Sequence, residues 1–177
     1  MRKVLKHLKS NAAIYLVLLA CLVVLLIVVL HKPQTELKPV DTSMFDVISL
    51  DRAIRFFDDN DPKLLVISTD NCQATAAYAD ALKYSMTTNN YKVYFLSLTT
   101  YKPEENEEKY NKLGELFNTN YQYQKTNLPL IEFVKHGYTP TTVIIKNKKI
   151  VYAFIGKMNT STLDSLSHAY GLGEVND

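Results

Sequence analysis

The chain has 177 residues, two cysteines and a formal net charge of +2, and four of its positive residues lie within the first nine positions. The remainder is therefore close to neutral and has no basic patch that would predict nucleic-acid binding. With only Cys21 and Cys72, and Cys21 inside an apolar run, the chain is not a disulfide scaffold.

The N-terminal segment is the most apolar part of the chain. Residues 12–30 (AAIYLVLLACLVVLLIVVL) carry no charge, and a helix of this length crosses the core of a bilayer. The flank MRKVLKHLK is denser in positive charge than the flank HKPQTELK, which predicts a cytoplasmic N-terminus. We expect a cytoplasmic tail at 1–11, a transmembrane helix at 12–30, a linker at 31–43 and an extracytoplasmic domain at 44–177.

Two other interpretations of this segment compete with an uncleaved anchor. A cleavable signal peptide needs a shorter apolar run and a small-residue cleavage site, and no A-x-A pattern follows the run. The residues LLAC at 18–21 loosely resemble a lipoprotein cleavage box, but nine more apolar residues follow Cys21. We favour the anchor, in which Cys21 is a small apolar membrane residue.

After the linker, short apolar runs alternate with helical patterns. Strands are predicted at 45–50, 63–68, 91–98, 142–145 and 149–155, and helices at 51–57, 72–87, 103–117 and 128–134. Asp51 is the expected cap of the first helix, Asn159 or Ser161 that of a last helix over Leu163 and Leu166, and residues 118–127 are expected to form a loop. The order β-α-β-α-β-α, then proline and β-β-α, predicts an α/β fold with helices on both faces of a mixed sheet.

Cys72 lies at a position in the sequence that favours a reactive thiol. Cys72 opens the helix that follows the strand KLLVIS and the loop TDN, and a helix N-terminus stabilises a thiolate. We expect the Thr75 hydroxyl, one turn further on, to point back at the sulfur and to lower the pKa of Cys72. Asp70 opposes a second negative charge, so the expected depression is modest.

A proline before the final hairpin completes the candidate site. The sequence Thr139-Pro140-Thr141 precedes a β-branched strand, and we expect the Thr139–Pro140 peptide bond to be cis. The backbone of Thr139 would then be free to pair with an extended substrate near the sulfur.

These motifs together resemble the thioredoxin fold over residues 44–170. The ending PTTVIIKNKKIVYAFIG is the strongest part of the match. The resemblance implies that Cys72 is the nucleophilic cysteine, that Thr75 stands at the position of the resolving cysteine, and that Pro140 is the cis-proline, with Thr139 before it.

The sequence also departs from that family. Thr75 removes the second cysteine, so an internal disulfide cannot form and dithiol exchange is closed. Val66 stands where thioredoxins place a buried acid, and Asn71 stands where a tryptophan usually precedes the cysteine. A single thiol can still attack a substrate disulfide and be released by another substrate thiol, which is isomerisation.

Among thioredoxin-like proteins, a short anchored domain with this ending resembles the bacteriocin-accessory proteins of lactic-acid bacteria. That resemblance implies a role in disulfide formation or isomerisation of an exported cysteine-containing peptide. Because Thr75 replaces the resolving cysteine, we expect a membrane-anchored protein that assists thiol-disulfide exchange or isomerisation with Cys72 alone, in the manner of an isomerase without a resolving cysteine. A redox-inactive binding module of a secretion or immunity system, using the Pro140 edge, is the alternative. A purely structural domain, with Cys72 as an inert buried thiol, is a third interpretation.

No cofactor or metal is expected. The four histidines are scattered, and none has metal-ligand spacing with Cys72. Tyr121 and Tyr123 are expected either to line a binding edge near the motif or, more simply, to belong to a surface loop.

Overall fold

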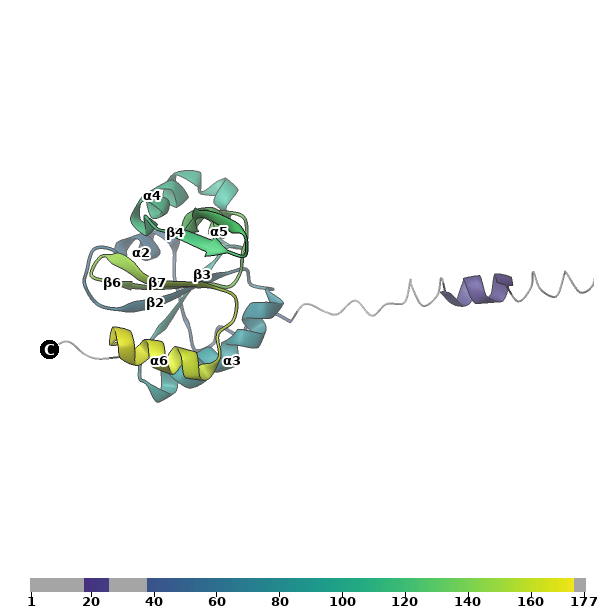
Figure 1. The fold of residues 1–177 in the computed structure, drawn as a ribbon, viewed down its shortest axis with the longest axis horizontal. Coiled ribbons are helices and arrows are strands. Elements are labelled where there is room, and N and C mark those ends of the chain that lie inside the picture. Colours follow the sequence, from purple (N-terminus) through teal and green to yellow (C-terminus); the bar gives the residue numbers. More distant parts are fainter. Residues whose placement is uncertain (1–17, 26–37, 174–177) are drawn as a thin grey trace, which may run out of the picture. The chain divides into compact units, whose positions relative to one another are not determined.

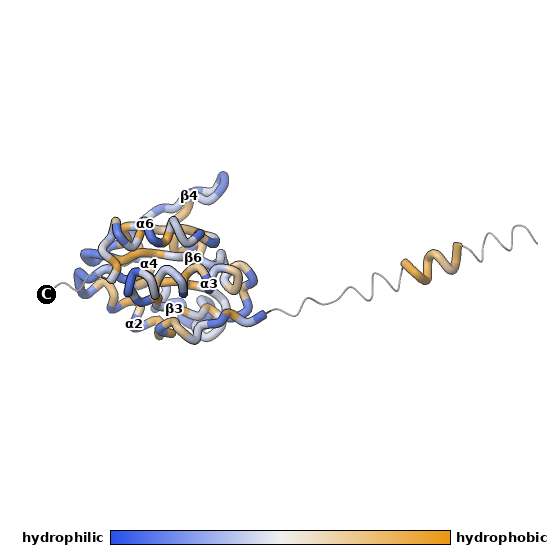
Figure 2. Tube along the Cα trace, turned by 90° about the horizontal axis from the view of Figure 1, so that it is seen from below, coloured by the Kyte–Doolittle hydropathy of each residue, from blue (hydrophilic) through white to orange (hydrophobic). Residues whose placement is uncertain are grey.

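The computed structural model describes residues 18–25 and 38–173, which form two separate units. Residues 18–25 are helical and hydrophobic throughout (Figure 2). The rest of the predicted anchor, the tail at 1–11 and residues 31–37 of the predicted linker lie outside the described residues. Within the described ranges, no helix combines the length and the apolar character that crossing a membrane requires.

A mixed sheet lies at the centre of the domain (Figure 1). It has five strands, in the order β1-β3-β2-β6-β7. Its strands are β1 (Asp46–Val47), β2 (Lys63–Ser68), β3 (Val93–Ser97), β6 (Thr141–Lys146) and β7 (Lys149–Ile155). The first three strands are parallel, and β6 and β7 are antiparallel to their neighbours, so the predicted topology is confirmed.

Helices cover both faces of this sheet, as the alternating pattern predicted (Figure 1). They are α2 (Leu50–Arg55), α3 (Gln73–Thr88), the 3-10 turn η1 (Pro103–Glu105), α4 (Glu107–Phe117), α5 (Leu130–Lys135) and α6 (Thr160–Tyr170). Helices α2, α4 and α5 pack on one face, and α3 and α6 pack on the other. The domain is therefore an α/β sandwich with a thioredoxin-like arrangement of elements.

Strand β2 holds the two halves of the core together. The run KLLVIS is apolar without alternation, as expected of a central strand that is covered on both faces. Leu65 and Ile67 face the α2 and α4 side, and Leu64 and Val66 face the α3 and α6 side. All four side chains are completely buried, so the loop that leads to Cys72 begins at a firmly packed strand.

The start of the domain differs from the prediction. The strand expected over 45–50 is only Asp46–Val47, because Leu50 already begins α2. The N-cap of α2 is Ser49 rather than Asp51, since the Ser49 side chain accepts a hydrogen bond from the N–H of Arg52 at 3.2 Å. Asp51 instead pairs with Lys109 of α4, at 2.6 Å.

A hairpin replaces the loop that was expected at 118–127. Strands β4 (Asn120–Tyr123) and β5 (Thr126–Pro129) form a separate two-stranded sheet, and β4 stands out from the body of the domain in Figure 2. The hairpin was not predicted because its strands bury few residues: each residue of β5 is exposed, and in β4 only Tyr121 and Tyr123 are half-buried.

Two helix boundaries were also refined. Asn106 interrupts the helix expected over 103–117 and separates η1 from α4. Of the two candidate caps for the last helix, Asn159 is the one used, and its side chain accepts from the N–H of Thr162 at 2.8 Å.

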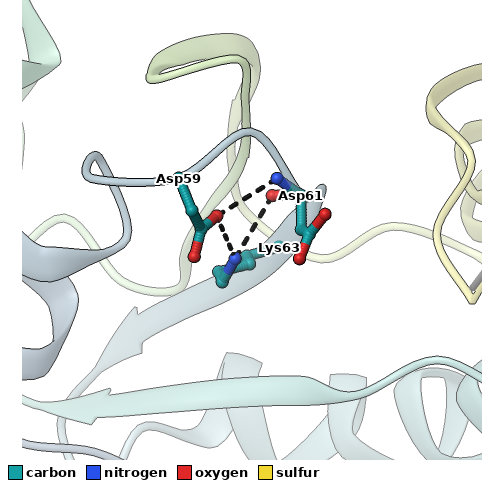
Figure 3. A network of polar contacts seen from close by, with 3 residues as sticks. All are labelled: Asp59, Asp61 and Lys63. Carbon is teal, nitrogen blue, oxygen red and sulfur yellow. Dashed lines mark hydrogen bonds and ion pairs between the residues drawn. The ribbon is translucent and has the colours of Figure 1, made fainter. Parts of the chain in front are cut away.

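The connection between α2 and β2 is tied down at Lys63 (Figure 3). Its ammonium donates to the Asp59 carboxylate and to the carbonyl of Asp61, and Asp59 also accepts from the N–H of Asp61 at 3.1 Å. The ammonium lies 5.7 Å from the ring centre of Phe56. This network anchors the first residue of the central strand.

The end of the predicted linker packs on the domain. The N–H of Val40 donates to the carbonyl of Asp70 at 2.8 Å, and Val40 is buried. Asp41 forms an ion pair with Lys83 of α3. Residues 38–41 therefore brace the loop that carries Cys72.

Candidate functional site

Helix α3 and strand β2 together position the thiol. Cys72 is the N-cap of α3, and its carbonyl accepts the first helical hydrogen bond, from Ala76 N–H at 2.9 Å. The N–H of Cys72 donates to the carbonyl of Thr69 at 3.3 Å, which closes the tight turn out of β2. The side chain is partly exposed and stands at the positive end of the helix dipole.

The turn that contains Pro140 faces this sulfur. The Thr139–Pro140 peptide bond is cis, as predicted. The Thr139 hydroxyl donates to Sγ of Cys72 at 3.3 Å, and Sγ in turn lies 3.6 Å from the carbonyl oxygen of Thr139. Pro140 is buried, and its carbonyl accepts from Gly156 N–H at 2.8 Å. The fold thus brings together two segments that are 67 positions apart.

Thr75 lies next to the sulfur but makes a different principal contact from the expected one. Its side chain is completely buried, and its hydroxyl oxygen lies 2.6 Å from that of Ser68. The hydroxyl that donates to Cys72 with good geometry is that of Thr139. At the position of a resolving cysteine, the chain therefore has the Thr75 hydroxyl, which is hydrogen-bonded to Ser68 at the end of β2.

The pKa of the Cys72 thiol is lowered from its ordinary value. Burial of the sulfur is the largest influence and favours the neutral form, but hydrogen bonds outweigh it. They come first from the Thr139 hydroxyl, then from the side chain and N–H of Thr75, and last from Ser68. All of these donors are neutral, and Asp70, which was expected to oppose ionisation, is not among the principal influences.

The edge beside the thiol offers unpaired backbone. Among the described residues, the N–H of Thr139 donates to no acceptor. Tyr138, immediately before it, is 41% exposed, while its own N–H is paired with the carbonyl of Phe133 at 3.0 Å. An extended chain lying along this turn would meet a free donor next to the sulfur.

The β4–β5 hairpin is attached to the same turn by aromatic packing. The Tyr123 ring lies edge-on to Tyr138 with centroids 5.6 Å apart, and both rings contact Phe133. Tyr121 also packs on Phe133, and its hydroxyl accepts from the N–H of Ile155 at 3.2 Å. Tyr121 and Tyr123 therefore belong to a hairpin that borders the site, and the simpler interpretation of a surface loop is wrong.

The central strand β2, which leads to the thiol, contains no carboxylate. Val66 is completely buried there, and its partner across the strand pair is Thr142. The hydroxyls of Thr142 and of Tyr78 on α3 are near one another, yet neither makes a hydrogen bond within the described residues. The environment of Cys72 is thus built from hydroxyls and apolar side chains.

Two residues of the site were missed at the level of sequence. Ser68 is the polar end of an otherwise apolar strand, and that contrast was its only signal. Tyr138 gave no signal, because its place beside the sulfur depends on the turn at Pro140 and on the hairpin. In the described part of the chain, no group of three or more His, Cys, Asp or Glu side chains is arranged to hold a metal ion.

Comparisons with known proteins give likenesses to solved thioredoxins. Oxidised thioredoxin from Plasmodium falciparum is 17% identical, covers 71% of this chain and 97% of its own, and has a TM-score of 0.44. Chloroplastic thioredoxin z is 14% identical, covers 72% of this chain and 94% of its own, and has a TM-score of 0.46. A mutant thioredoxin from Halobacterium salinarum is 16% identical, covers 75% of this chain and 93% of its own, and also has a TM-score of 0.46. No family model and no curated protein matches the sequence. The thioredoxin-like arrangement of this chain is defined by its strand order and by the cis-proline turn that faces Cys72.

Proposed function

We propose that this chain is a membrane-anchored, extracytoplasmic thioredoxin-like protein that uses Cys72 alone for thiol-disulfide exchange. The observation that carries the proposal is the hydrogen bond from the Thr139 hydroxyl to the Cys72 sulfur. A helix N-cap and a neutral donor both favour the thiolate, which is the nucleophilic form of cysteine.

The chemistry available to a single thiol is isomerisation. The Cys72 thiolate attacks one sulfur of a substrate disulfide, so that a Cys72–S bond forms, the substrate S–S bond breaks, and the other substrate sulfur leaves as a thiolate. A second substrate thiolate then attacks the mixed disulfide, forms a new substrate disulfide and releases Cys72. The substrate is neither oxidised nor reduced overall, and no further oxidant is needed.

Residues on the Thr139 edge would hold the substrate during both steps. The free N–H of Thr139 can donate to a carbonyl of an extended peptide, in the manner of strand addition. The partner we propose is an exported peptide that contains cysteines, as in the bacteriocin-accessory type. The anchor rests on the uncharged run at 12–30, and the extracytoplasmic side on the charge asymmetry around it.

The decisive experiment uses a two-disulfide peptide with scrambled bridges as the probe. In a Cys21→Ser background, we expect the protein to accelerate reshuffling without added oxidant and to yield a mixed disulfide at Cys72 that mass spectrometry detects. Cys72→Ser should abolish both. Equal reshuffling by the Cys72→Ser variant would refute the proposal.

A redox-inactive binding module is the second candidate. The observation in its favour is Thr75, whose buried hydroxyl occupies the place of a second thiol. This alternative predicts that partner binding survives Cys72→Ser but is lost when the 139–141 edge is altered, for example by Thr139→Pro. Calorimetric titration of the same peptide separates the two candidates.

A further inference from the structure

The hydroxyl of Ser68 connects the central strand to the candidate site. Ser68 is the last residue of β2, is completely buried, and lies 2.6 Å from the Thr75 hydroxyl through its Oγ atom. The same Oγ lies 3.3 Å from the carbonyl oxygen of Thr69, to which it can donate. Either hydroxyl of the Ser68–Thr75 pair can be the donor. The pair therefore has two hydrogen-bond arrangements with the same heavy-atom positions.

The two arrangements differ in what Thr75 can offer to the sulfur. If Ser68 donates to the Thr69 carbonyl, the Thr75 hydrogen is used on Ser68 and is not available to Cys72. If Ser68 donates to Thr75, the Thr75 hydrogen is free to turn toward the sulfur. We propose that Ser68 is a positioning residue for the thiolate: on loss of the thiol proton to solvent, it turns its hydrogen to Thr75, and Thr75 donates to Sγ.

Neutral donors of this kind suit the surroundings of the thiol. The segments next to Cys72 include charged or titratable side chains: Asp70 in the loop before it, Lys38 and Asp41 in the segment that packs on that loop, and Tyr138 in the turn before Pro140. None of them hydrogen-bonds to Sγ, whereas the Thr139 hydroxyl does. Thr139 stabilises the sulfur from the solvent side and the Ser68–Thr75 pair from the buried side, so that two independent donors act on one thiolate.

This inference deepens the proposed function and rests on it, but its test needs no disulfide substrate. The experiment measures the pKa of Cys72 in the full chain in detergent, in a Cys21→Ser background, from the pH dependence of the rate of alkylation by iodoacetamide. The variants are Ser68→Ala, Thr75→Val and the double variant. Ser97→Ala is the matched control, because Ser97 is a buried serine at the end of β3, directly beside Ser68 in the sheet.

We expect Ser68→Ala to raise the pKa of Cys72 by about 0.5 pH unit, the effect of one weakened neutral hydrogen bond to a thiolate. Thr75→Val should raise it by at least as much, and the double variant no further than Thr75→Val. The Ser68 hydroxyl contacts the Thr75 hydroxyl and the Thr69 carbonyl but forms no hydrogen bond to Sγ among the described residues, so we expect its effect to pass through Thr75. Ser97→Ala should leave it unchanged.

Three results would overturn the inference. They are an unchanged pKa in Ser68→Ala while Thr75→Val raises it, fully additive shifts in the double variant, or an equal shift in Ser97→Ala. Because the assay reports ionisation and not exchange, it can succeed where reshuffling fails. The reverse outcome, normal reshuffling with an unchanged pKa in Ser68→Ala, removes the role of Ser68 and leaves the proposed function standing.

Discussion

The ionisation of Cys72 depends on how single side chains surround its sulfur atom. Burial disfavours the Cys72 thiolate, yet the hydroxyls of Thr139, Thr75 and Ser68 more than compensate. Hydrogen bonds to a charged partner are stronger than those between neutral groups, which is why a few hydroxyls suffice. The site thus favours a nucleophile without a cationic neighbour in contact with it.

Removal of the Thr139 hydroxyl tests this balance. We expect Thr139→Val to raise the pKa of Cys72 by about 0.5–1 pH unit, because burial remains while the strongest donor is lost. Alkylation at pH 7 should slow by roughly three- to tenfold, since the thiolate is the reactive form. Thr141→Val is the control, because its hydroxyl donates to the Tyr138 carbonyl and not to sulfur. An unchanged rate in Thr139→Val would contradict the geometry.

The same shift makes folding stability depend on pH. The pKa of Cys72 is lower in the folded protein than in the unfolded chain, where it is about 8.5. The folded state therefore binds the proton less tightly, and stability rises with pH between these two values. We expect the unfolding free energy of the wild type, relative to Cys72→Ser, to increase as the pH passes through the native pKa and to level off above the unfolded one. Urea titrations across this range would show it, and a falling difference would contradict it.

Among the elements, α3 carries both the site and a buried polar defect beneath it. Tyr78 and Thr142 place hydroxyls in the core between α3 and β6, and burial raises the pKa of Tyr78. In contrast, the equally buried Tyr110 of α4 donates to the Tyr101 carbonyl at 2.7 Å. A buried tyrosine hydroxyl thus has a hydrogen-bond partner on the α4 face of the sheet, whereas the one on the α3 face has none within the described residues.

This contrast gives a prediction with its own internal control. Tyr110→Phe should lower the free energy of unfolding by about 1 kcal/mol, because a satisfied hydrogen bond is lost. Tyr78→Phe should leave it unchanged or raise it, since a hydroxyl without a partner is removed from the core. Chemical denaturation of the two variants measures both values. A loss in Tyr78→Phe equal to that in Tyr110→Phe would show that the Tyr78 hydroxyl has a partner after all.

For the molecule as a whole, the proposed location rests on the N-terminal segment. The run at 12–30 is uncharged, and the described part of it is helical, with exposed apolar side chains. Uncharged apolar runs of this length are typical of bilayer-spanning helices, which is the basis of the proposed anchor. The two hydrophobic clusters of the domain consist of residues between Val40 and Leu172.

Fractionation and labelling of cells test this arrangement. We expect the full chain to stay in the membrane fraction after alkaline carbonate extraction, and residues 38–177 alone to be soluble with unchanged alkylation of Cys72. A membrane-impermeant maleimide should label Cys72 in intact cells or protoplasts. Labelling only after lysis would place the domain in the cytoplasm and would remove exported peptides as substrates.

The local features of this fold were predictable because they depend on neighbouring residues. The uninterrupted apolar run of β2, the N-cap position of Cys72 and the turn before β6 each involve a short window of sequence. Strand periodicity and X-Pro geometry act over such windows, and these predictions agree with the structure. The β4–β5 hairpin was not predicted, because its strands are short and mostly exposed and therefore bury few residues.

The amino-acid sequence thus identified Cys72, Thr75 and Pro140, but not Ser68 or the Thr139 hydroxyl as donors that act on the sulfur. The contact between Thr139 and Cys72 joins positions 67 apart, and the Ser68–Thr75 pair depends on how β2 meets α3. Which hydroxyl faces a thiol follows from packing between elements and not from spacing along the chain. For that reason, the sequence predicted a hydrogen bond from Thr75 to the sulfur, whereas the direct hydroxyl contact in the folded chain comes from Thr139.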